Sequence, residues 1–84
     1  MNDLIARLER AEPNNELDVL VEIALFKPCS AFASIRSNFA GTKVIYTDHE
    51  GKDYTHWAPD WSGQPGHRAY AIAALRAQQK DTNA

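Results

Sequence analysis

Residues 16–26 have the sequence ELDVLVEIALF, and this stretch decides the fold. Five of its apolar residues recur at the spacing of one helical face: Leu17, Leu20, Val21, Ala24 and Leu25. Val19, Ile23 and Phe26 add apolar side chains on a second face. Because a helix that is apolar around most of its circumference is usually packed on two sides, the stretch predicts a central helix. We expect Leu20→Ala to leave a cavity there and to destabilise the protein by about 2–5 kcal/mol.

A shorter helix is predicted before the central one, over residues 3–11. Its apolar stripe consists of Leu4, Ile5, Leu8 and Ala11. Asn2 or Asp3 caps its first turn, because a short side-chain oxygen accepts from the free N–H groups there. Pro13 ends this helix, since the residue before a proline avoids helical angles.

The central helix has its own boundary signals. Asn14 and Asn15 supply turn chemistry and a cap at its start, and Pro28 closes its end. The sequence therefore predicts two helices joined by a tight turn.

Two short segments in these helices carry a resemblance to a known family. They are DLIARLE, residues 3–9, and ELD, residues 16–18, with a weaker similarity in AALRA, residues 73–77. The segments resemble the N-terminal signature of small phage- and prophage-encoded proteins grouped as the phage ABA sandwich family. The resemblance implies a domain that acts stoichiometrically on host machinery, including defence complexes, and it supplies no catalytic residue. The tyrosine-serine/threonine-alanine stretch often seen mid-chain in longer members is missing from this sequence.

A β-hairpin is predicted in the middle of the chain. Residues 42–47, TKVIYT, and 53–58, DYTHWA, are rich in β-branched and aromatic residues, which favour strands. Gly51 lies between them, where a hairpin turn requires a positive φ. Pro59 ends the second strand.

The remaining segments complete an α+β domain spanning residues 1–84. Residues 30–39 alternate in a way that permits a third strand, but alanine and serine are poor strand formers, so this segment stays open. An alanine-rich apolar stripe predicts a C-terminal helix over residues 68–80, and residues 81–84 are expected to fray. Strands grouped between helices favour two N-terminal helices, an antiparallel hairpin or three-stranded sheet, and one C-terminal helix.

The expected core takes apolar side chains from all of these elements. They are Leu4, Ile5, Leu8, Leu17, Leu20, Val21, Ala24, Leu25, Val44 or Ile45, Trp57, Ile72 and Leu75.

Composition limits the classes of function. The net charge of −2 is too small to imply a polyanionic or polycationic partner. It is unevenly distributed, because residues 1–26 hold six acidic residues against two arginines. Cys29 is the single cysteine, which fits a reducing compartment, and the chain contains no signal-peptide pattern and no apolar run long enough for a bilayer. We therefore expect a soluble intracellular protein without membrane contact, and the resemblance to phage proteins implies the cytoplasm of a bacterial host cell.

Catalytic and metal chemistry are weakly indicated. His49, His56 and His67 lack the paired spacing that zinc sites use, so we expect surface histidines, no metal and no cofactor. Cys29 follows a helix C-terminus, where the dipole does not activate a thiol, so it is expected to be a small apolar filler. Asp18 and Glu22 lie four residues apart, and we expect a solvated pair or partners for a base of the C-terminal helix rather than an acid–base site.

Two candidate surfaces for binding a protein partner follow from charge and aromatic content. The acidic helical face comprises Glu9, Glu12, Glu16, Asp18 and Glu22. The aromatic edge comprises Tyr54, Trp57 and Trp61. The alternative for Trp57 or Trp61 is a structural role that closes the edge of the core. By strand alternation, Tyr54 faces one side of the sheet and Trp57 the other. The acidic face is favoured for an inhibitor of a complex with basic grooves.

The sequence thus favours a non-enzymatic protein-binding module. The resemblance to phage proteins implies, as its most concrete form, an inhibitor of a bacterial defence complex of the anti-CRISPR type. The alternative is a nucleic-acid-binding or regulatory protein, in which basic residues beside the aromatic residues contact a single strand. The acidic balance makes nucleic acid the less favoured partner. The sequence leaves open whether the chain forms a homodimer.

Overall fold

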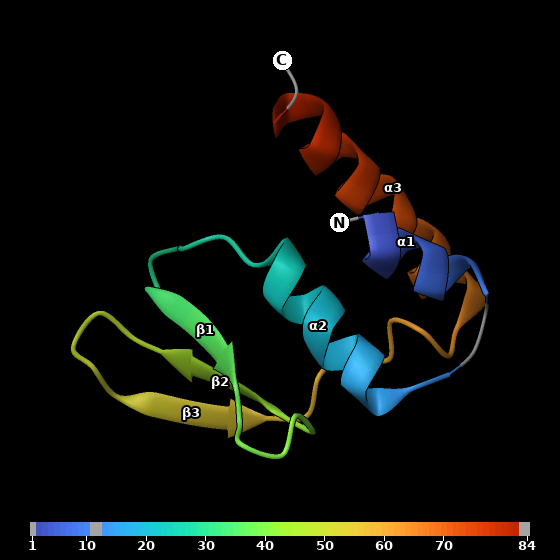
Figure 1. Cartoon of the computed structure of the whole chain (residues 1–84). Coiled ribbons are helices and arrows are strands. Elements are labelled where there is room, and N and C mark those ends of the chain that lie inside the picture. Colours follow the sequence, from blue (N-terminus) through green and yellow to red (C-terminus); the bar gives the residue numbers. More distant parts are fainter. Residues whose placement is uncertain (1, 11–12, 83–84) are drawn as a thin grey trace.

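The computed structural model of the chain describes residues 2–10 and 13–82, with the side chains of residues 4–10 and 13–78. These residues form three helices and three strands, in the order α1 (Asn2–Glu9), α2 (Asn15–Leu25), β1 (Ser34–Ser37), β2 (Val44–Thr47), β3 (Asp53–His56) and α3 (Pro65–Thr82) (Figure 1). The strands make one antiparallel sheet in the order β1-β2-β3. The predicted α+β fold class is confirmed.

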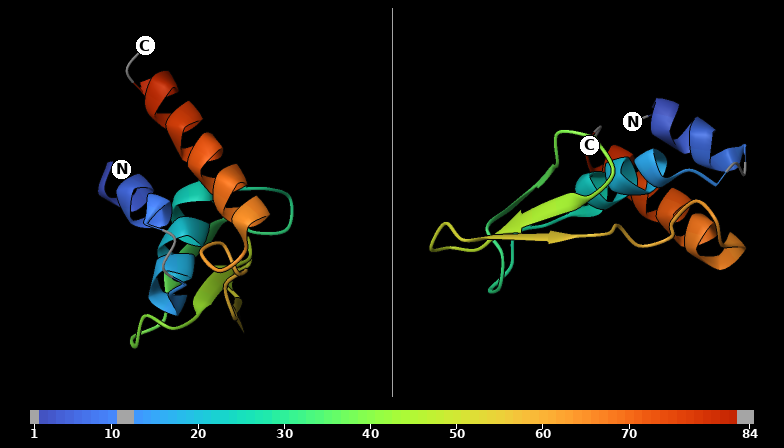
Figure 2. Two further views of the ribbon diagram at one scale, coloured as in Figure 1. Left: turned by 90° about the vertical axis from the view of Figure 1, so that its right-hand side faces the viewer. Right: turned by 90° about the horizontal axis from the view of Figure 1, so that it is seen from below.

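Helix α2 is the middle layer of the molecule. The sheet contacts one side of α2 through β1 and β2, whereas α1 and α3 pack against α2 elsewhere and against each other (Figures 1 and 2). Among the described elements, α2 is the only helix in contact with the sheet. The prediction of a central helix packed on two sides is confirmed.

The predicted boundaries of α2 are also confirmed. The side-chain oxygen of Asn14 accepts a hydrogen bond from the N–H of Leu17 at 3.1 Å, and the extended backbone of Asn14 makes it the N-cap. The helix ends at Leu25, shortly before Pro28.

The ends of the other two helices differ from the prediction. Helix α1 ends at Glu9, and the predicted roles of residue 11 and of the residue 2–3 side chains lie outside the described part of the chain. Helix α3 begins at Pro65 instead of residue 68, because proline has the φ of a first helical residue and needs no N–H there. It continues through Thr82, into the segment that was expected to fray.

Strand β1 resolves the segment that the sequence leaves open. Ser34 to Ser37 pair antiparallel with Thr47 to Val44. The N–H of Ala33 adds a hydrogen bond of 2.8 Å to the carbonyl of Thr47. Pairing with the strong strand β2 therefore overrides the weak strand propensity of this segment.

Residues 48–52 form the predicted hairpin turn. The N–H of Asp48 donates to the carbonyl of Lys52 at 2.9 Å, and Gly51 has a φ of 90°. The carboxylate of Asp48 accepts from the N–H groups of Lys52 and Glu50, and these bonds, first that of Lys52, lower the pKa of Asp48. The turn is thus stabilised by one side chain as well as by glycine.

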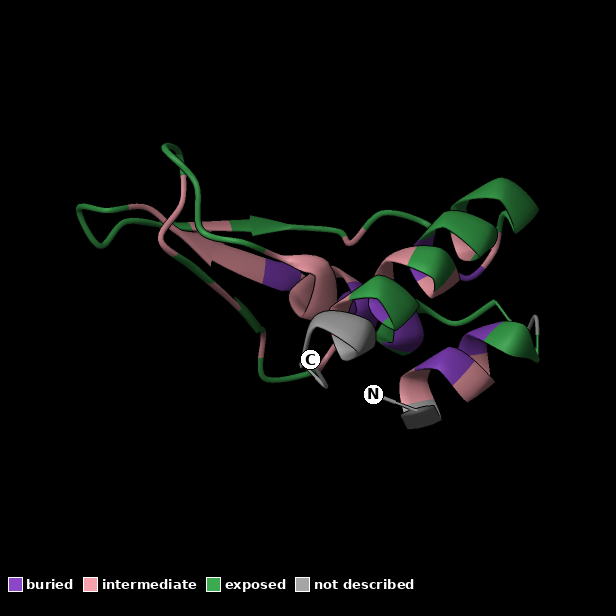
Figure 3. Ribbon diagram, turned by 90° about the horizontal axis from the view of Figure 1, so that it is seen from above, coloured by how far each residue is buried: buried purple, intermediate pink, exposed green. Residues whose placement is uncertain are grey.

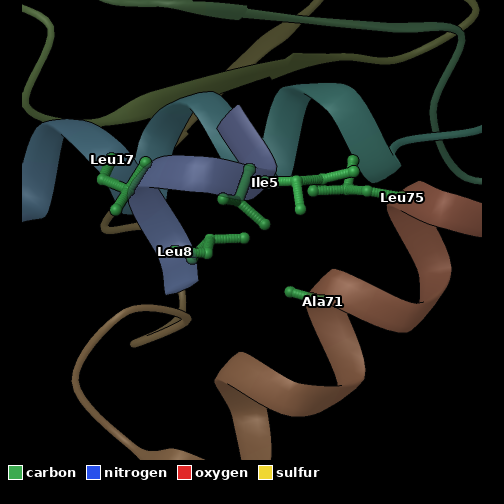
Figure 4. Packing of buried hydrophobic residues seen from close by; sticks show 6 residues of the cluster. Ile5, Leu8, Leu17, Ala71 and Leu75 are labelled. Atoms are coloured by element: carbon green, nitrogen blue, oxygen red, sulfur yellow. The ribbon is translucent and has the colours of Figure 1, made fainter. Parts of the chain in front are cut away.

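The main core lies where the three helices meet. Figure 4 shows side chains of α1, α2 and α3 directed toward one another, and the buried members of this cluster are Ile5, Leu8, Leu17, Val21, Ala71 and Leu75. Val19 and Val44 are buried as well. In Figure 3 the buried positions gather on α2 and on the elements around it.

The expected core was wrong at Leu20 and Trp57, whose side chains are 45% and 65% exposed. Helix α2 turns Leu17 toward the other helices, Val19 away from them and Asp18 toward Ser62, and all of these residues are buried. At 3.6 residues per turn, this leaves Leu20 on the narrow side that faces solvent. The expectation that Leu20→Ala leaves a cavity in the core and strongly destabilises the protein therefore does not hold.

Candidate functional site

A groove lies between the C-terminal half of α2 and α3, and we call it the α2–α3 groove. Its cavity has a volume of about 410 Å³, which is within the range of ligand pockets. It is lined by Glu22, Leu25, Phe26, Lys27, Trp61, Tyr70, Ala74, Ala77 and Gln78. Ala74 and Ala77 supply α3 with short side chains at this position, so the helix leaves space beside α2.

The aromatic wall of the α2–α3 groove is a stacked pair. The rings of Trp61 and Tyr70 have centroids 5.9 Å apart and an interplanar angle of 15°. His67 contacts Trp61 edge-on at 6.1 Å. Tyr70 is 65% exposed, whereas Trp61 is only partly exposed. The groove therefore presents a large aromatic surface that the fold has not buried.

Glu22 links three parts of the fold at the α2–α3 groove. Its Oε1 accepts from the indole N–H of Trp61 at 3.0 Å, and its Oε2 accepts from the hydroxyl of Tyr46 on β2. Both donors are neutral, so these bonds orient the carboxylate without balancing its charge. Glu22 forms no ion pair within the described residues.

Tyr46, which is partly buried and hydrogen-bonded to Glu22, makes stability depend on alkaline pH. Burial, and then the hydrogen bond to Glu22, raise the pKa of Tyr46 in the folded protein. In the unfolded chain a tyrosine ionises at about pH 10. The stabilisation from Tyr46 is therefore complete below that pH and is lost as pH rises above it. We expect Tyr46→Phe to flatten the fall of the unfolding free energy above about pH 10, measured by urea unfolding. Equal slopes for wild type and variant would contradict this assignment.

Asp18 does not lie in a solvated seam, and the sequence prediction was wrong here. Its side chain is 7% exposed. Its Oδ1 accepts from both the backbone N–H and the hydroxyl of Ser62, each at 2.7 Å. The Ser62 hydroxyl oxygen in turn accepts from the N–H of Asn14 at 2.9 Å. Asp18 and Glu22 therefore attach consecutive residues, Ser62 and Trp61, to α2.

The other acidic candidates do not complete a continuous acidic face. Glu9 forms an ion pair with Arg76 of α3 at 2.8 Å, so this arginine pairs with α1 and not with Asp18 or Glu22 of α2. Glu16 is exposed beside Leu20, and Glu12 lies outside the described residues. Asp18 turns inward and Glu22 is held by two donors. The described members of the predicted acidic face therefore do not form one continuous charged surface.

The predicted aromatic edge separates into three surroundings. Trp61 lines the α2–α3 groove. Trp57 is exposed, with Nζ of Lys43 lying 4.6 Å from its ring centroid. Tyr54 packs against Phe32 and its hydroxyl donates to Asp48 at 3.3 Å. Of the three aromatic residues predicted from the sequence, Trp61 is therefore the one that lines the α2–α3 groove.

Two expectations about reactive side chains have different outcomes. His49, His56 and His67 are exposed, as predicted. Cys29 is exposed too, so its prediction as an apolar filler was wrong. The Cys29 carbonyl accepts from Nε2 of His49 at 2.7 Å, which holds this loop beside the hairpin turn with the thiol outside the core.

In the described part of the chain, no group of His, Cys, Asp and Glu side chains is arranged to hold a metal ion, and no helix there combines the length and apolarity of a membrane span. Comparing the chain with protein-family models, with curated proteins and with solved structures gives no match in any of the three.

Proposed function

We propose that this chain is a small, non-enzymatic protein-binding module that docks its partner at the α2–α3 groove. The observation that carries the proposal is the Trp61–Tyr70 stack, in which Tyr70 stays 65% exposed beside a cavity of about 410 Å³. Tryptophan and tyrosine dominate binding energy at protein interfaces because they bury much area with few rotatable bonds. An exposed stack beside a hollow therefore suits an anchor side chain of a partner.

The same geometry argues for binding rather than catalysis. Both oxygens of Glu22, the groove's carboxylate, already accept hydrogen bonds from Tyr46 and Trp61. A general base needs a free path to the proton that it removes, and here the two donors fix the orientation of the carboxylate.

The biological setting of the proposal comes from the sequence. The resemblance of residues 3–9 and 16–18 to small phage proteins supports stoichiometric action on a bacterial host complex, with inhibition of a defence complex of the anti-CRISPR type as the concrete form. In this chain Ile5, Leu8 and Leu17 of these segments are core residues. They therefore support the kind of domain more than the identity of its partner.

The test compares two exposed aromatic residues on different surfaces. A tagged wild-type chain is used to capture its partner from a bacterial lysate, and the affinity for the purified partner is then measured. We expect Tyr70→Ala to weaken binding at least about 30-fold, the loss typical of a hot spot. Trp57→Ala is the matched control, because Trp57 is equally exposed but lies outside the groove. A loss with Trp57→Ala and none with Tyr70→Ala would place the interface elsewhere.

A second candidate is binding of single-stranded nucleic acid at the β2–β3 hairpin. The observation that favours it is the pairing of two lysines with aromatic rings, Lys43 with Trp57 and Lys52 with Tyr54. The arginine on this sheet contributes less, because Arg36 is paired with Asp53 at 2.8 Å. Oligonucleotide binding that weakens steeply with salt would support this candidate, since phosphate contacts release counterions.

A further inference from the structure

We infer that the α2–α3 groove recognises an arginine side chain of the partner. This inference rests on the proposed function, because it names the chemistry of the group that the groove receives. It is carried by the juxtaposition of the Glu22 carboxylate with the stacked rings of Trp61 and Tyr70 in one cavity.

The carboxylate supplies the charge complement. Glu22 accepts from Trp61 and Tyr46, which are neutral, and it has no ion pair within the described residues. A carboxylate offers about four lone-pair sites, so each oxygen keeps the capacity for one more hydrogen bond. Its negative charge therefore stays available to a cationic group that enters the groove.

The aromatic wall favours a guanidinium over an ammonium. A planar guanidinium stacks on aromatic faces and donates to a carboxylate in the same plane, and it is less strongly hydrated than an ammonium. Trp61 and Tyr70 stack on each other with an interplanar angle of 15°, and Tyr70 is 65% exposed, so the stack leaves aromatic surface accessible to a guanidinium. Arginine is also one of the residues enriched at interface hot spots.

Lys27 is the charged group that opposes this recognition. It lines the same cavity and is exposed, and no ion pair within the described residues neutralises it. Its repulsion of a guanidinium is screened by solvent, whereas Glu22 is partly buried and less screened. The attraction by Glu22 therefore outweighs the repulsion by Lys27. Removing the charge of Lys27 is a direct test of this comparison.

The test uses N-acetyl-arginine methylamide as the probe and the neutral isostere N-acetyl-citrulline methylamide as its control. Binding is followed by the indole N–H signal of Trp61 in NMR spectra, assigned with Trp57→Phe, since the chain has two tryptophans. We expect a saturable shift with the arginine probe and about 5- to 30-fold weaker binding of the citrulline probe.

Two variants separate recognition from structure. Glu22→Gln preserves both hydrogen bonds, because its amide oxygen accepts from Trp61 and its amide N–H donates to the Tyr46 hydroxyl. It is expected to bind the arginine probe about 5- to 30-fold more weakly with an unchanged melting temperature. Lys27→Ala is expected to strengthen binding about twofold at low salt. A purely structural role of Glu22 predicts neither result.

The outcomes distinguish this inference from the proposed function. Equal binding of the two probes, or no saturable shift, overturns arginine recognition, and a loss of partner affinity in Tyr70→Ala would still support the groove as the docking site. Arginine-selective binding supports the inference. If Tyr70→Ala then leaves the partner's affinity unchanged, the proposed docking site is wrong while the groove retains its ligand.

Discussion

Leu75→Ala is expected to lower the free energy of unfolding by about 2–5 kcal/mol, the range for a leucine truncated in a packed core. Leu75 is 0% exposed and lies in the cluster where α3 meets α1 and α2 (Figure 4). A domain of this size has a total stability of about 5–10 kcal/mol, so the variant should lose a large share of it. Urea unfolding at neutral pH measures the change.

The matched control is Leu20→Ala, the same substitution on a leucine that is 45% exposed. It is expected to cost less than about 1 kcal/mol, because solvent already surrounds much of the side chain. A loss at Leu20 as large as that at Leu75 would mean that α2 is rotated from the orientation described above.

Asp18→Ala should be the second large loss, about 2–4 kcal/mol. The change removes the carboxylate oxygen that accepts from the N–H and the hydroxyl of Ser62, each at 2.7 Å. The hydroxyl can still donate to the carbonyl of Asn14 at 3.2 Å, whereas the buried N–H loses its acceptor. Each unsatisfied buried donor costs about 1–3 kcal/mol. Thermal unfolding followed by circular dichroism should show a drop in melting temperature of roughly 10–25 °C.

Asp18→Asn serves as the control for this loss. The asparagine retains an acceptor oxygen of the same reach, so we expect it to preserve much of the stability that Asp18→Ala removes. Glu9→Ala removes an exposed ion pair with Arg76 and should change stability by less than about 1 kcal/mol. If all three variants melt together with the wild type, the Asp18–Ser62 contact does not hold the fold.

The helices and the hairpin could be predicted because their signals are local. The Asn14 cap, the apolar run of α2 and the Gly51 turn each depend on residues a few positions apart. The same information predicted Val44 or Ile45 in the core, and of these two residues Val44 is the buried one. It could not orient α2 fully, because Leu20 follows the same apolar spacing as Leu17 and Val21.

The inward direction of Asp18 and Glu22 depends on partners far along the chain. Ser62 is 44 positions from Asp18, and Trp61 is 39 positions from Glu22. Spacing on one helix cannot reveal such donors, so it predicts only a solvated pair or partners for a base of the C-terminal helix. The available signal was the position of two acids in an otherwise apolar helix, which indicates buried acceptors whenever the helix is covered on several sides.

The α2–α3 groove was beyond prediction for the same reason. It forms where the end of α2 meets Trp61 and the alanine positions of α3, and no continuous segment contains these residues. In the sequence, the residues around Tyr70 in α3 look like those of any solvent-exposed helical face. Its importance comes from stacking on Trp61, a contact that only the packing of residue 61 against α2 and α3 creates.

The attachment of residues 61–62 to α2 has a consequence for the thermodynamics of association. Ser62 is held by Asp18 and Asn14, Trp61 by Glu22, and the Ser62 carbonyl accepts from Arg68 of α3 at 3.3 Å. The indole is therefore immobilised before any partner arrives, and a partner does not have to order it. Such preorganisation removes an entropic penalty of roughly 0.5–1.5 kcal/mol for each side chain already fixed. The free and occupied grooves should superimpose closely, as surfaces that bind without rearrangement do.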